Sequence, residues 1–246
     1  MSVVTHPQPH DRDSASRPAG TDEGEHGLPA AVLWDMDGTL VDTEPYWMAA
    51  QVELVASYGH DWTHEDGLTL VGSGLWHSAR VLQGRGVTMT EDEIIDHLTN
   101  RVLEQLVEFG IPWRPGAHEL LGELRERGIP TALVTMSISR MAHHVADRLG
   151  FAGFDVVVSG DDVTHAKPHP QPYLQAAELL GVDITRCVAI EDSEPGVASA
   201  SASGAVTIGV PFMVPLSASA DYTLWPSLEG RTVADLAELY SAVGAR

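Results

Sequence analysis

Short runs of apolar residues, rich in β-branched side chains, recur along the chain and predict buried strands. They occupy residues 31–34, 131–135, 155–159, 187–190 and 205–209. Continuous apolar runs of this length are typical of strands covered on both faces, as in a parallel sheet packed between helices. The pattern therefore predicts a five-stranded parallel sheet.

Helical patterns separate the later strands, and a glycine follows each of them. The expected helices and their glycines are residues 117–127 with Gly128, 139–149 with Gly150, and 170–180 with Gly181. A glycine just past the last turn is a common signal for the end of a helix. Because a strand follows each glycine within a few residues, the alternation predicts a doubly wound α/β domain.

One interval breaks this alternation. Roughly ninety-five residues separate the first two strands, far more than a crossover connection needs. Helical patterns fill much of it, at 45–58, 74–83 and 91–109, before a turn signal at 113–116. We therefore expect a core built from residues 30–44 and 114–246, with an all-helical cap inserted at 45–113.

Composition narrows the functional classes. The chain carries 35 acidic and 14 basic residues, a formal net charge of −21, and a field of that sign repels nucleic acids and anionic membranes. Residues 1–29 mix Pro, Gly, Ser, His and acidic residues without an apolar segment, so they predict a disordered tail rather than a targeting signal. We expect a cytoplasmic protein, with a monomer as the default state. The single cysteine, Cys187, lies in an apolar run and is expected to be a buried thiol.

Acidic residues follow the first predicted strand. Asp35 and Asp37 come directly after it, and Gly38 allows the backbone to turn sharply. In open α/β sheets the carboxyl ends of strands face the ligand crevice, and two nearby carboxylates can serve as nucleophile and general acid/base. A solvated acidic loop or a helix N-cap explains this segment alone equally well.

A second acidic pair, Glu191 and Asp192, follows the strand at 187–190. In a parallel sheet, Asp192 and Asp35 can meet at the same edge despite their separation in sequence. Carboxylate oxygens with room for water suit Mg²⁺, whereas the absence of His and Cys from these motifs argues against zinc.

Two further residues add weaker signals. Lys167 is the only lysine of the chain, and Thr135 ends the second predicted strand. An ammonium group suits a phosphoryl oxygen beside carboxylates, and a hydroxyl with nearby backbone N–H groups can hold phosphate. Taken singly, a surface lysine and a threonine placed for packing remain reasonable interpretations.

Together these segments resemble the haloacid dehalogenase superfamily, in its phosphatase and β-phosphoglucomutase-like branch. The motifs occur in the family's order: residues 35–39 (Asp-Met-Asp-Gly-Thr), then Thr135, then Lys167-Pro168, then residues 191–193 (Glu-Asp-Ser) with Gly196. The resemblance implies a Rossmann-like core and a helical cap between the first two motifs.

The resemblance also implies roles in catalysis. Asp35 would attack phosphorus and form an aspartyl-phosphate, while Asp37 would protonate the leaving oxygen and later activate water. Thr135 and Lys167 would hold the oxygens of the transferring phosphoryl group.

A metal site is implied as well. Mg²⁺ would be held by Asp35, Asp192 and the backbone carbonyl of Asp37, with Glu191 acting through water and Ser193 lying beside the ligands. Positioning and charge neutralisation would then dominate catalysis, and the cations would offset the negative field locally.

The sequence favours a phosphatase within this branch. An acid at the place of Asp37 is missing from the family's dehalogenases and phosphonatases, so its presence favours phosphate esters. The mutases use a basic cap segment for a second phosphate, whereas residues 69–76 contain no Lys or Arg and Arg80 is the nearest candidate. We therefore expect hydrolysis of a small phosphorylated metabolite. A sugar phosphomutase and a catalytically silent binding module on the same fold remain the alternatives.

Overall fold

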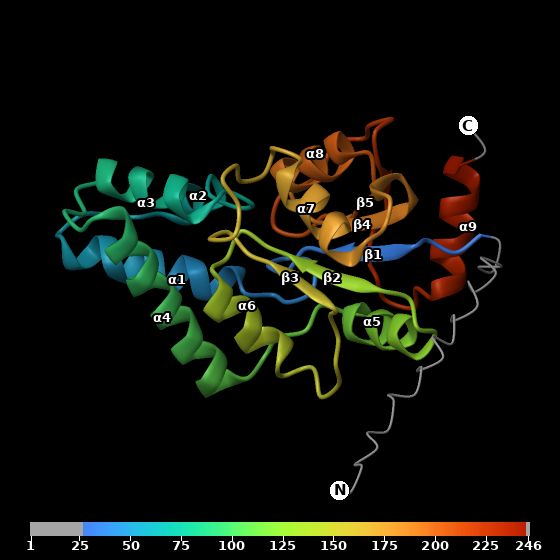
Figure 1. Ribbon diagram of the computed structural model, residues 1–246. Helices are drawn as coiled ribbons and strands as arrows, with labels where there is room; N and C mark the ends of the chain where they lie inside the picture. The colour runs from blue at the N-terminus through green and yellow to red at the C-terminus, as the bar shows by residue number, and fades with distance from the viewer. Residues whose placement is uncertain (1–26, 245–246) are drawn as a thin grey trace, which may run out of the picture.

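The computed structural model describes residues 27–244; residues 1–26 of the predicted tail lie outside this range (Figure 1). At its centre the described chain forms a parallel sheet with the strand order β3-β2-β1-β4-β5-β6. The strands are β1 (Ala31–Trp34), β2 (Thr131–Val134), β3 (Val156–Val158), β4 (Cys187–Glu191), β5 (Val206–Gly209) and β6 (Thr223–Leu224). The predicted doubly wound α/β core is thereby confirmed.

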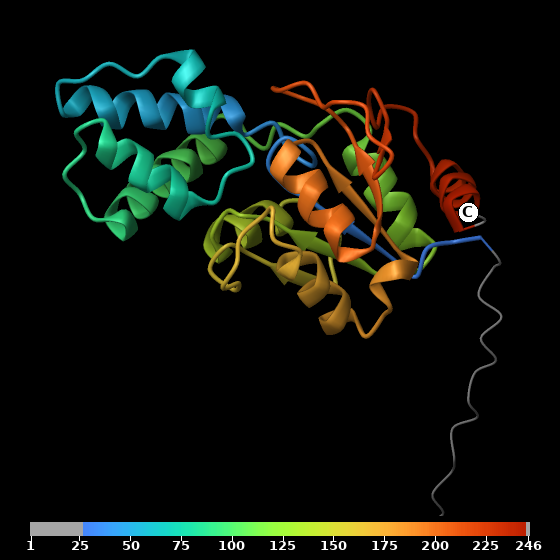
Figure 2. The ribbon, with the colours of Figure 1, turned by 90° about the horizontal axis from the view of Figure 1, so that it is seen from above.

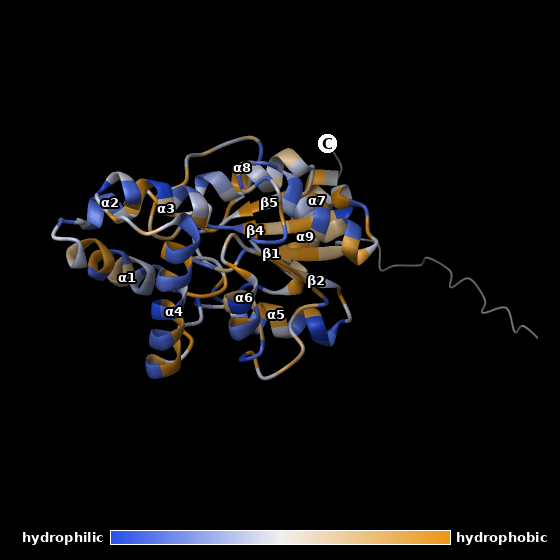
Figure 3. Ribbon diagram, turned by 60° about the vertical axis from the view of Figure 1, so that its left-hand side comes forward, coloured by the Kyte–Doolittle hydropathy of each residue, from blue (hydrophilic) through white to orange (hydrophobic). Residues whose placement is uncertain are grey.

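Helices cover both faces of the sheet (Figures 1 and 2). They are α5 (Ala117–Glu126), α6 (Ser139–Ala146), α7 (Gln171–Leu180), α8 (Glu194–Ser203) and α9 (Val233–Gly244). Side chains alternate along β1, so that Ala31 and Leu33 join the apolar cluster beneath α7 and α8, while Val32 and Trp34 face the cluster of α5 and α6. Helix α9 packs on α5. Figure 3 shows the apolar strands between helices whose outer faces are polar.

The helical insert lies at the carboxyl end of the sheet, on the left in Figure 1. It contains α1 (Glu44–Ser57), α2 (His64–Leu68), α3 (Leu75–Gly84) and α4 (Glu91–Phe109). Helix α4 begins at a capping box in which Thr90 and Glu93 satisfy each other's backbone N–H groups, and it packs on both α1 and α3. The cap boundaries at 45–113 stay a prediction, although these helices occupy that interval.

Some elements differ from the sequence expectations. Helix α6 ends at Ala146 rather than at residue 149, because the backbone continues as turns up to Gly150, whose φ is +82°. Helices α2, α8 and α9 and strand β6 were not predicted; α8 is rich in Ala and Ser and has little apolar periodicity, and β6 spans two residues. Cys187 is buried as expected, and burial raises the pKa of its thiol to about 12. Within residues 27–244 there is no helix of the length and apolarity that a membrane span requires.

Candidate active site

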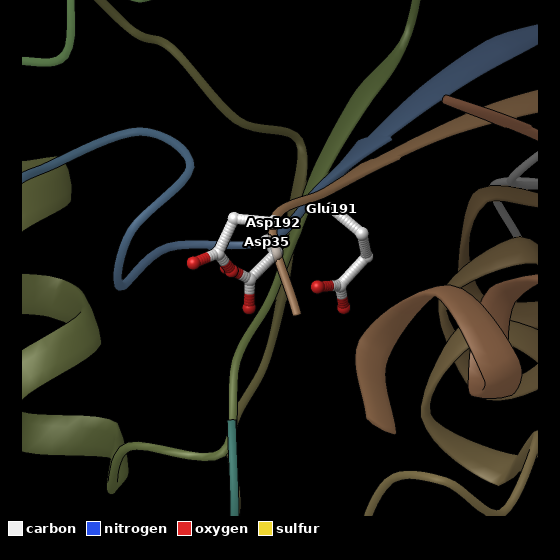
Figure 4. Close-up of side chains that lie close together, drawn as sticks. All are labelled: Asp35, Glu191 and Asp192. Atoms are coloured by element: carbon white, nitrogen blue, oxygen red, sulfur yellow. The ribbon is translucent and has the colours of Figure 1, made fainter. Parts of the chain in front are cut away.

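Three carboxylates meet where β1 and β4 end. The two strands are paired so that Trp34 lies beside Ile190, which places Asp35 next to Glu191 and Asp192. The Asp35 N–H donates to the Ile190 carbonyl at 3.0 Å. One oxygen from each of the three buried carboxylates lies within 4.8 Å of the others, and Figure 4 shows them gathered at this edge. The parallel register therefore produces the predicted meeting of Asp35 and Asp192.

Lys167 lies among these carboxylates and is only 6% exposed. Its Nζ is 2.7 Å from Asp35 Oδ1 and 2.6 Å from Glu191 Oε1, and it donates to the Val134 carbonyl at 2.9 Å. Burial opposes the charge, but the two carboxylates raise the pKa of Lys167 above its ordinary value. Tyr173 of α7 also donates to Glu191 Oε1, at 2.5 Å. The only lysine of the chain is thus a buried partner of the acidic cluster rather than a surface residue.

The donor set fits a hard divalent cation. Asp35 Oδ2, Asp192 Oδ2 and Glu191 Oε2 are buried and have no hydrogen-bond partner within the described residues. Burial and the neighbouring Glu191 charge raise the pKa of Asp35 to about 7, and burial and Asp35 raise the pKa of Asp192. A Cβ on Gly38 would lie 2.1 Å from Asp192 Oδ2, so any larger residue at position 38 would displace this carboxylate. Oxygen ligands of this kind are those that Mg²⁺ prefers, and a cation would favour their charged forms.

The Asp37 carboxylate has other partners. Its Oδ1 accepts hydrogen bonds from Thr43 Oγ1 and from Trp47 Nε1, the latter at 3.0 Å. Its Oδ2 accepts from Ser137 Oγ at 2.7 Å and from Thr135 Oγ1 at 3.3 Å. Asp37 is thereby fixed between α1 and the turn after β2, outside the cluster of three carboxylates. This position agrees with the expectation that only its backbone would contribute to a metal site, which stays a prediction.

Ser193 and Gly196 shape the other side of the cluster. Ser193 caps α8, with its Oγ accepting the Gly196 N–H at 3.2 Å. A Cβ on Gly196 would lie 1.8 Å from Glu191 Oε2, so the helix can approach this carboxylate only with glycine there. The role of Glu191 through water stays a prediction; its Oε1 accepts hydrogen bonds from Lys167 and Tyr173 directly.

A small cavity of about 60 Å³ lies between the sheet edge and the helical insert. The loop after α2 closes it, because Gly72 packs so tightly on Ser193 that a Cβ would meet Ser193 Oγ at 2.5 Å. A wider cleft of about 1120 Å³ lies outside this loop and shares Ser73 and Lys167 with the cavity. The predicted site residues Asp35, Asp37, Thr135, Lys167, Asp192 and Ser193 all line the cavity. Glu191 lies behind them and is fully buried.

Four further residues of the site escaped the sequence reasoning. Glu44, Trp47 and Ser137 line the cavity, and Tyr173 supports Glu191. Trp47 is buried in the apolar core of the cap, and its indole N–H also donates to Asp37. The available signal was the closeness in sequence of Glu44 and Trp47 to the Asp35 motif.

Known proteins share the sequence pattern. The family model of haloacid dehalogenase-like hydrolases matches residues 29–204. Hexitol phosphatase B of Escherichia coli is 32% identical over 189 residues, covering 74% of this chain and 83% of that protein. Fructose-1-phosphate phosphatase of the same organism is 30% identical over 184 residues, covering 74% of this chain and 96% of that protein.

A solved structure shares the fold. CbbY from Rhodobacter sphaeroides, in complex with xylulose-(1,5)bisphosphate, superposes with a TM-score of 0.78 at 30% identity, over 85% of this chain and 99% of that one. The β-phosphoglucomutase of Clostridium difficile has a TM-score of 0.77 at 23% identity, covering 89% and 100%. The latter likeness shows the fold alone.

Proposed function

The chain belongs to the haloacid dehalogenase-like hydrolase family, and on that premise we propose that it is a magnesium-dependent phosphatase of small phosphorylated carbohydrates. One arrangement of buried groups supports this most. Asp35 and Asp192 each direct an unpartnered oxygen to the same sheet edge, beside the ammonium group of Lys167. Such a set can hold a divalent cation and a phosphoryl group together, whereas a silent binding module has no need of it.

Asp35 would supply the nucleophile. Its Oδ1 lies 2.7 Å from Lys167 Nζ, which would hold the carboxylate in place. One carboxylate oxygen would attack phosphorus, break the bond to the leaving oxygen and form the aspartyl-phosphate, while the other would stay with the cation. Lys167 and Thr135 line the same cavity and would hold the equatorial phosphoryl oxygens as negative charge moves onto the leaving oxygen. Glu191 would keep Lys167 charged and in place.

Mg²⁺ held by Asp35, Asp192 and the backbone of Asp37 would supply neutralisation of charge on the phosphoryl group. Asp37 would protonate the leaving oxygen and then take a proton from the attacking water. Its four hydrogen-bond donors hold the carboxylate at a fixed place in the lining of the cavity, outside the cluster of three carboxylates. Asp37 can therefore reach the leaving group without competing for the metal.

The lining of the cavity supports a phosphatase over a mutase. Leu75 lines it and belongs to residues 69–76, the stretch that corresponds to the basic segment of the mutases and contains no Lys or Arg. Arg80 lies on the outer cleft, where its guanidinium pairs with Glu91 at 2.8 Å. The chain thus offers no evident cation for a second phosphate among the described residues of the inner cavity. Hydrolysis of a monophosphate fits this lining better than transfer within a bisphosphate.

A direct assay tests the proposal. The purified full chain would be supplied with Mg²⁺ and with fructose 1-phosphate, glucitol 6-phosphate or 4-nitrophenyl phosphate, and free phosphate measured with and without EDTA. We expect release that requires Mg²⁺. Absence of release from every one of these esters by a folded sample would exclude a phosphatase. Conversion of a hexose 1-phosphate to the 6-phosphate that outruns release would indicate a mutase.

A further inference from the structure

Glu44 is a buried carboxylate without an assigned role. It is the first residue of α1, is 8% exposed, and lines the inner cavity together with Asp35 and Asp37. Among the described residues, no hydrogen bond or ion pair involves its side chain. An acidic residue at the start of a helix favours the helix dipole, but that benefit does not require burial in a cavity. Burying a carboxyl group without a partner costs free energy of folding. A ligand in the cavity could supply the partner that Glu44 lacks.

Neutral polar groups surround Glu44 on the same side of the cavity. Gln51 lies two turns further along the same face of α1, and its Oε1 accepts the Trp62 Nε1–H at 3.2 Å, which fixes the orientation of the amide. Ser73 and Ser78 add hydroxyl groups to the lining. These groups can exchange hydrogen bonds with the hydroxyls of a substrate, and they carry no positive charge.

The cavity is poorly suited to a second anion. Lys167 is the only basic side chain among the described residues that line it, and its charge is shared between Asp35 and Glu191. Burial and the negative charges of Asp37 and other nearby carboxylates raise the pKa of Glu44 to about 8, so the local field disfavours negative charge. A phosphate or carboxylate on the leaving group would lie in this field without a cationic partner.

We propose that Glu44 and Gln51 bind hydroxyl groups of an uncharged leaving group, and thereby select monophosphates of sugars or polyols over substrates that carry a second anion. This inference rests on the proposed phosphatase function and specifies its substrate class. Relatives and structural neighbours differ in this respect: a hexitol phosphatase has an uncharged leaving group, whereas CbbY was solved with a bisphosphate. The described lining of this cavity, with Lys167 as its only basic side chain, favours an uncharged leaving group.

A matched pair of substrates tests the inference. Glucitol 6-phosphate and 6-phosphogluconate have the same chain length and differ at the far end, where one carries a hydroxymethyl group and the other a carboxylate. We expect wild-type kcat/KM to favour glucitol 6-phosphate by about 100-fold, since sites that hydrogen-bond a polar group discriminate strongly. The hydrolysis of 4-nitrophenyl phosphate, measured in parallel, reports the chemistry without the hydroxyl groups.

Variants then assign the preference to these residues. Glu44→Gln should reduce the ratio of kcat/KM values for the pair to about 10-fold or less, because the amide offers N–H donors to the carboxylate of 6-phosphogluconate and accepts fewer hydrogen bonds from the hydroxyls of glucitol 6-phosphate. Gln51→Leu should also reduce the ratio, through a higher KM for glucitol 6-phosphate, and it provides a second test if the first variant does not fold. Glu53→Gln is the matched control on the same helix, where the side chain is exposed and pairs with Arg101, and it should leave the ratio unchanged.

The outcomes separate the two proposals. If folded wild type hydrolyses none of the three esters with Mg²⁺, both the function and the inference are wrong. If it hydrolyses 4-nitrophenyl phosphate but shows no preference between the pair, or if the variants that fold keep the wild-type ratio, the inference is overturned and the phosphatase stands. Equal losses on all three esters in Glu44→Gln and Gln51→Leu would show a structural role and also overturn the inference.

Discussion

The two sides of the inner cavity are built differently. At the sheet edge, Asp35, Asp192 and Lys167 are fixed by paired strands and by direct contacts between opposite charges. On the side of the helical insert, Glu44 and Gln51 project from one helix and leave hydrogen-bonding capacity facing the cavity. The first side is organised by contacts within the protein, whereas on the second side the Glu44 carboxyl has no hydrogen-bond or ion-pair partner among the described residues.

On the proposed function, this difference would separate chemistry from selectivity. Electrostatic stabilisation of a transition state requires groups that are already in place, which the carboxyl ends of parallel strands provide. Selection of the leaving group requires side chains that can differ without disturbing the groups at the strand ends, and an inserted set of helices provides such side chains. Trp47 links the two sides, since it belongs to α1 and donates to Asp37.

The largest effect is expected from the sheet edge. Asp35→Asn should lower phosphate release by roughly 10⁴-fold, on the scale of losing a nucleophile, because an amide cannot form the acyl phosphate. The measurement is turnover of 4-nitrophenyl phosphate by a sample whose circular dichroism matches wild type. Asp61→Asn, at an exposed position of the insert, is the control and should turn over normally. Substantial activity in Asp35→Asn would remove the nucleophile assignment.

The sequence predicted the sheet-edge side well, for a physical reason. Apolar runs located the strands, and because parallel strands end at a common edge, Asp35 and Asp192 could be placed together without coordinates. The ordered motifs then singled out Lys167, which alone would have passed for a surface residue. The pattern did not predict which residue pairs with each charged group. Tyr173, for example, donates to Glu191, but in the sequence it resembles any aromatic residue on the buried face of a helix.

The insert side was less predictable. Its residues lie on helices, where a polar side chain inside a cavity and one in solvent give the same sequence pattern. Glu44 directly precedes the predicted helix at 45–58 and Trp47 lies within it, and nothing in the pattern distinguishes the two from a surface acid and a core aromatic residue. Only the packing of α1 over the sheet edge shows that both face the cavity. The proposed selectivity would therefore depend on tertiary contacts that periodicity does not encode.

Asp37→Asn should separate the two halves of the reaction. General acid/base catalysis contributes about 10²–10⁴-fold, and we expect losses of that size with sugar phosphates. With 4-nitrophenyl phosphate the leaving group needs no proton, so rapid mixing should reveal a burst of about one equivalent of nitrophenolate before slow turnover. A steady rate equal to that of wild type, without a burst, would be inconsistent with acid/base catalysis by Asp37.

Lys167→Ala should destabilise the metal-free protein, by about 3 kcal/mol, since it leaves buried carboxylates without their cation. Unfolding by urea in EDTA measures this, and added Mg²⁺ should recover part of the loss because it binds the folded cluster. Lys167→Ala should also lose phosphatase activity, and Lys167→Arg should not restore it, since a planar guanidinium fits poorly where a compact ammonium group is buried. Arg125→Ala, which breaks the surface pair with Asp155, is the control and should show a small loss that Mg²⁺ does not change. Stability like that of wild type in Lys167→Ala would show that Lys167 does not offset the charge of the buried carboxylates.

The smallest expected effect concerns the link between the two sides. Trp47→Phe keeps an aromatic ring in the buried position but removes the indole N–H that donates to Asp37 at 3.0 Å. A hydrogen bond to a charged group contributes about 1.5 kcal/mol, so kcat should fall by roughly tenfold. KM should stay near that of wild type, because the lost contact orients Asp37 and does not touch the leaving group. Trp225→Phe, at an equally buried position elsewhere in the core, controls for the loss of ring volume and should leave both constants unchanged. If Trp47→Phe instead raised KM with kcat unchanged, Trp47 would belong to the substrate-binding side, and the two sides of the cavity would be coupled only through the substrate.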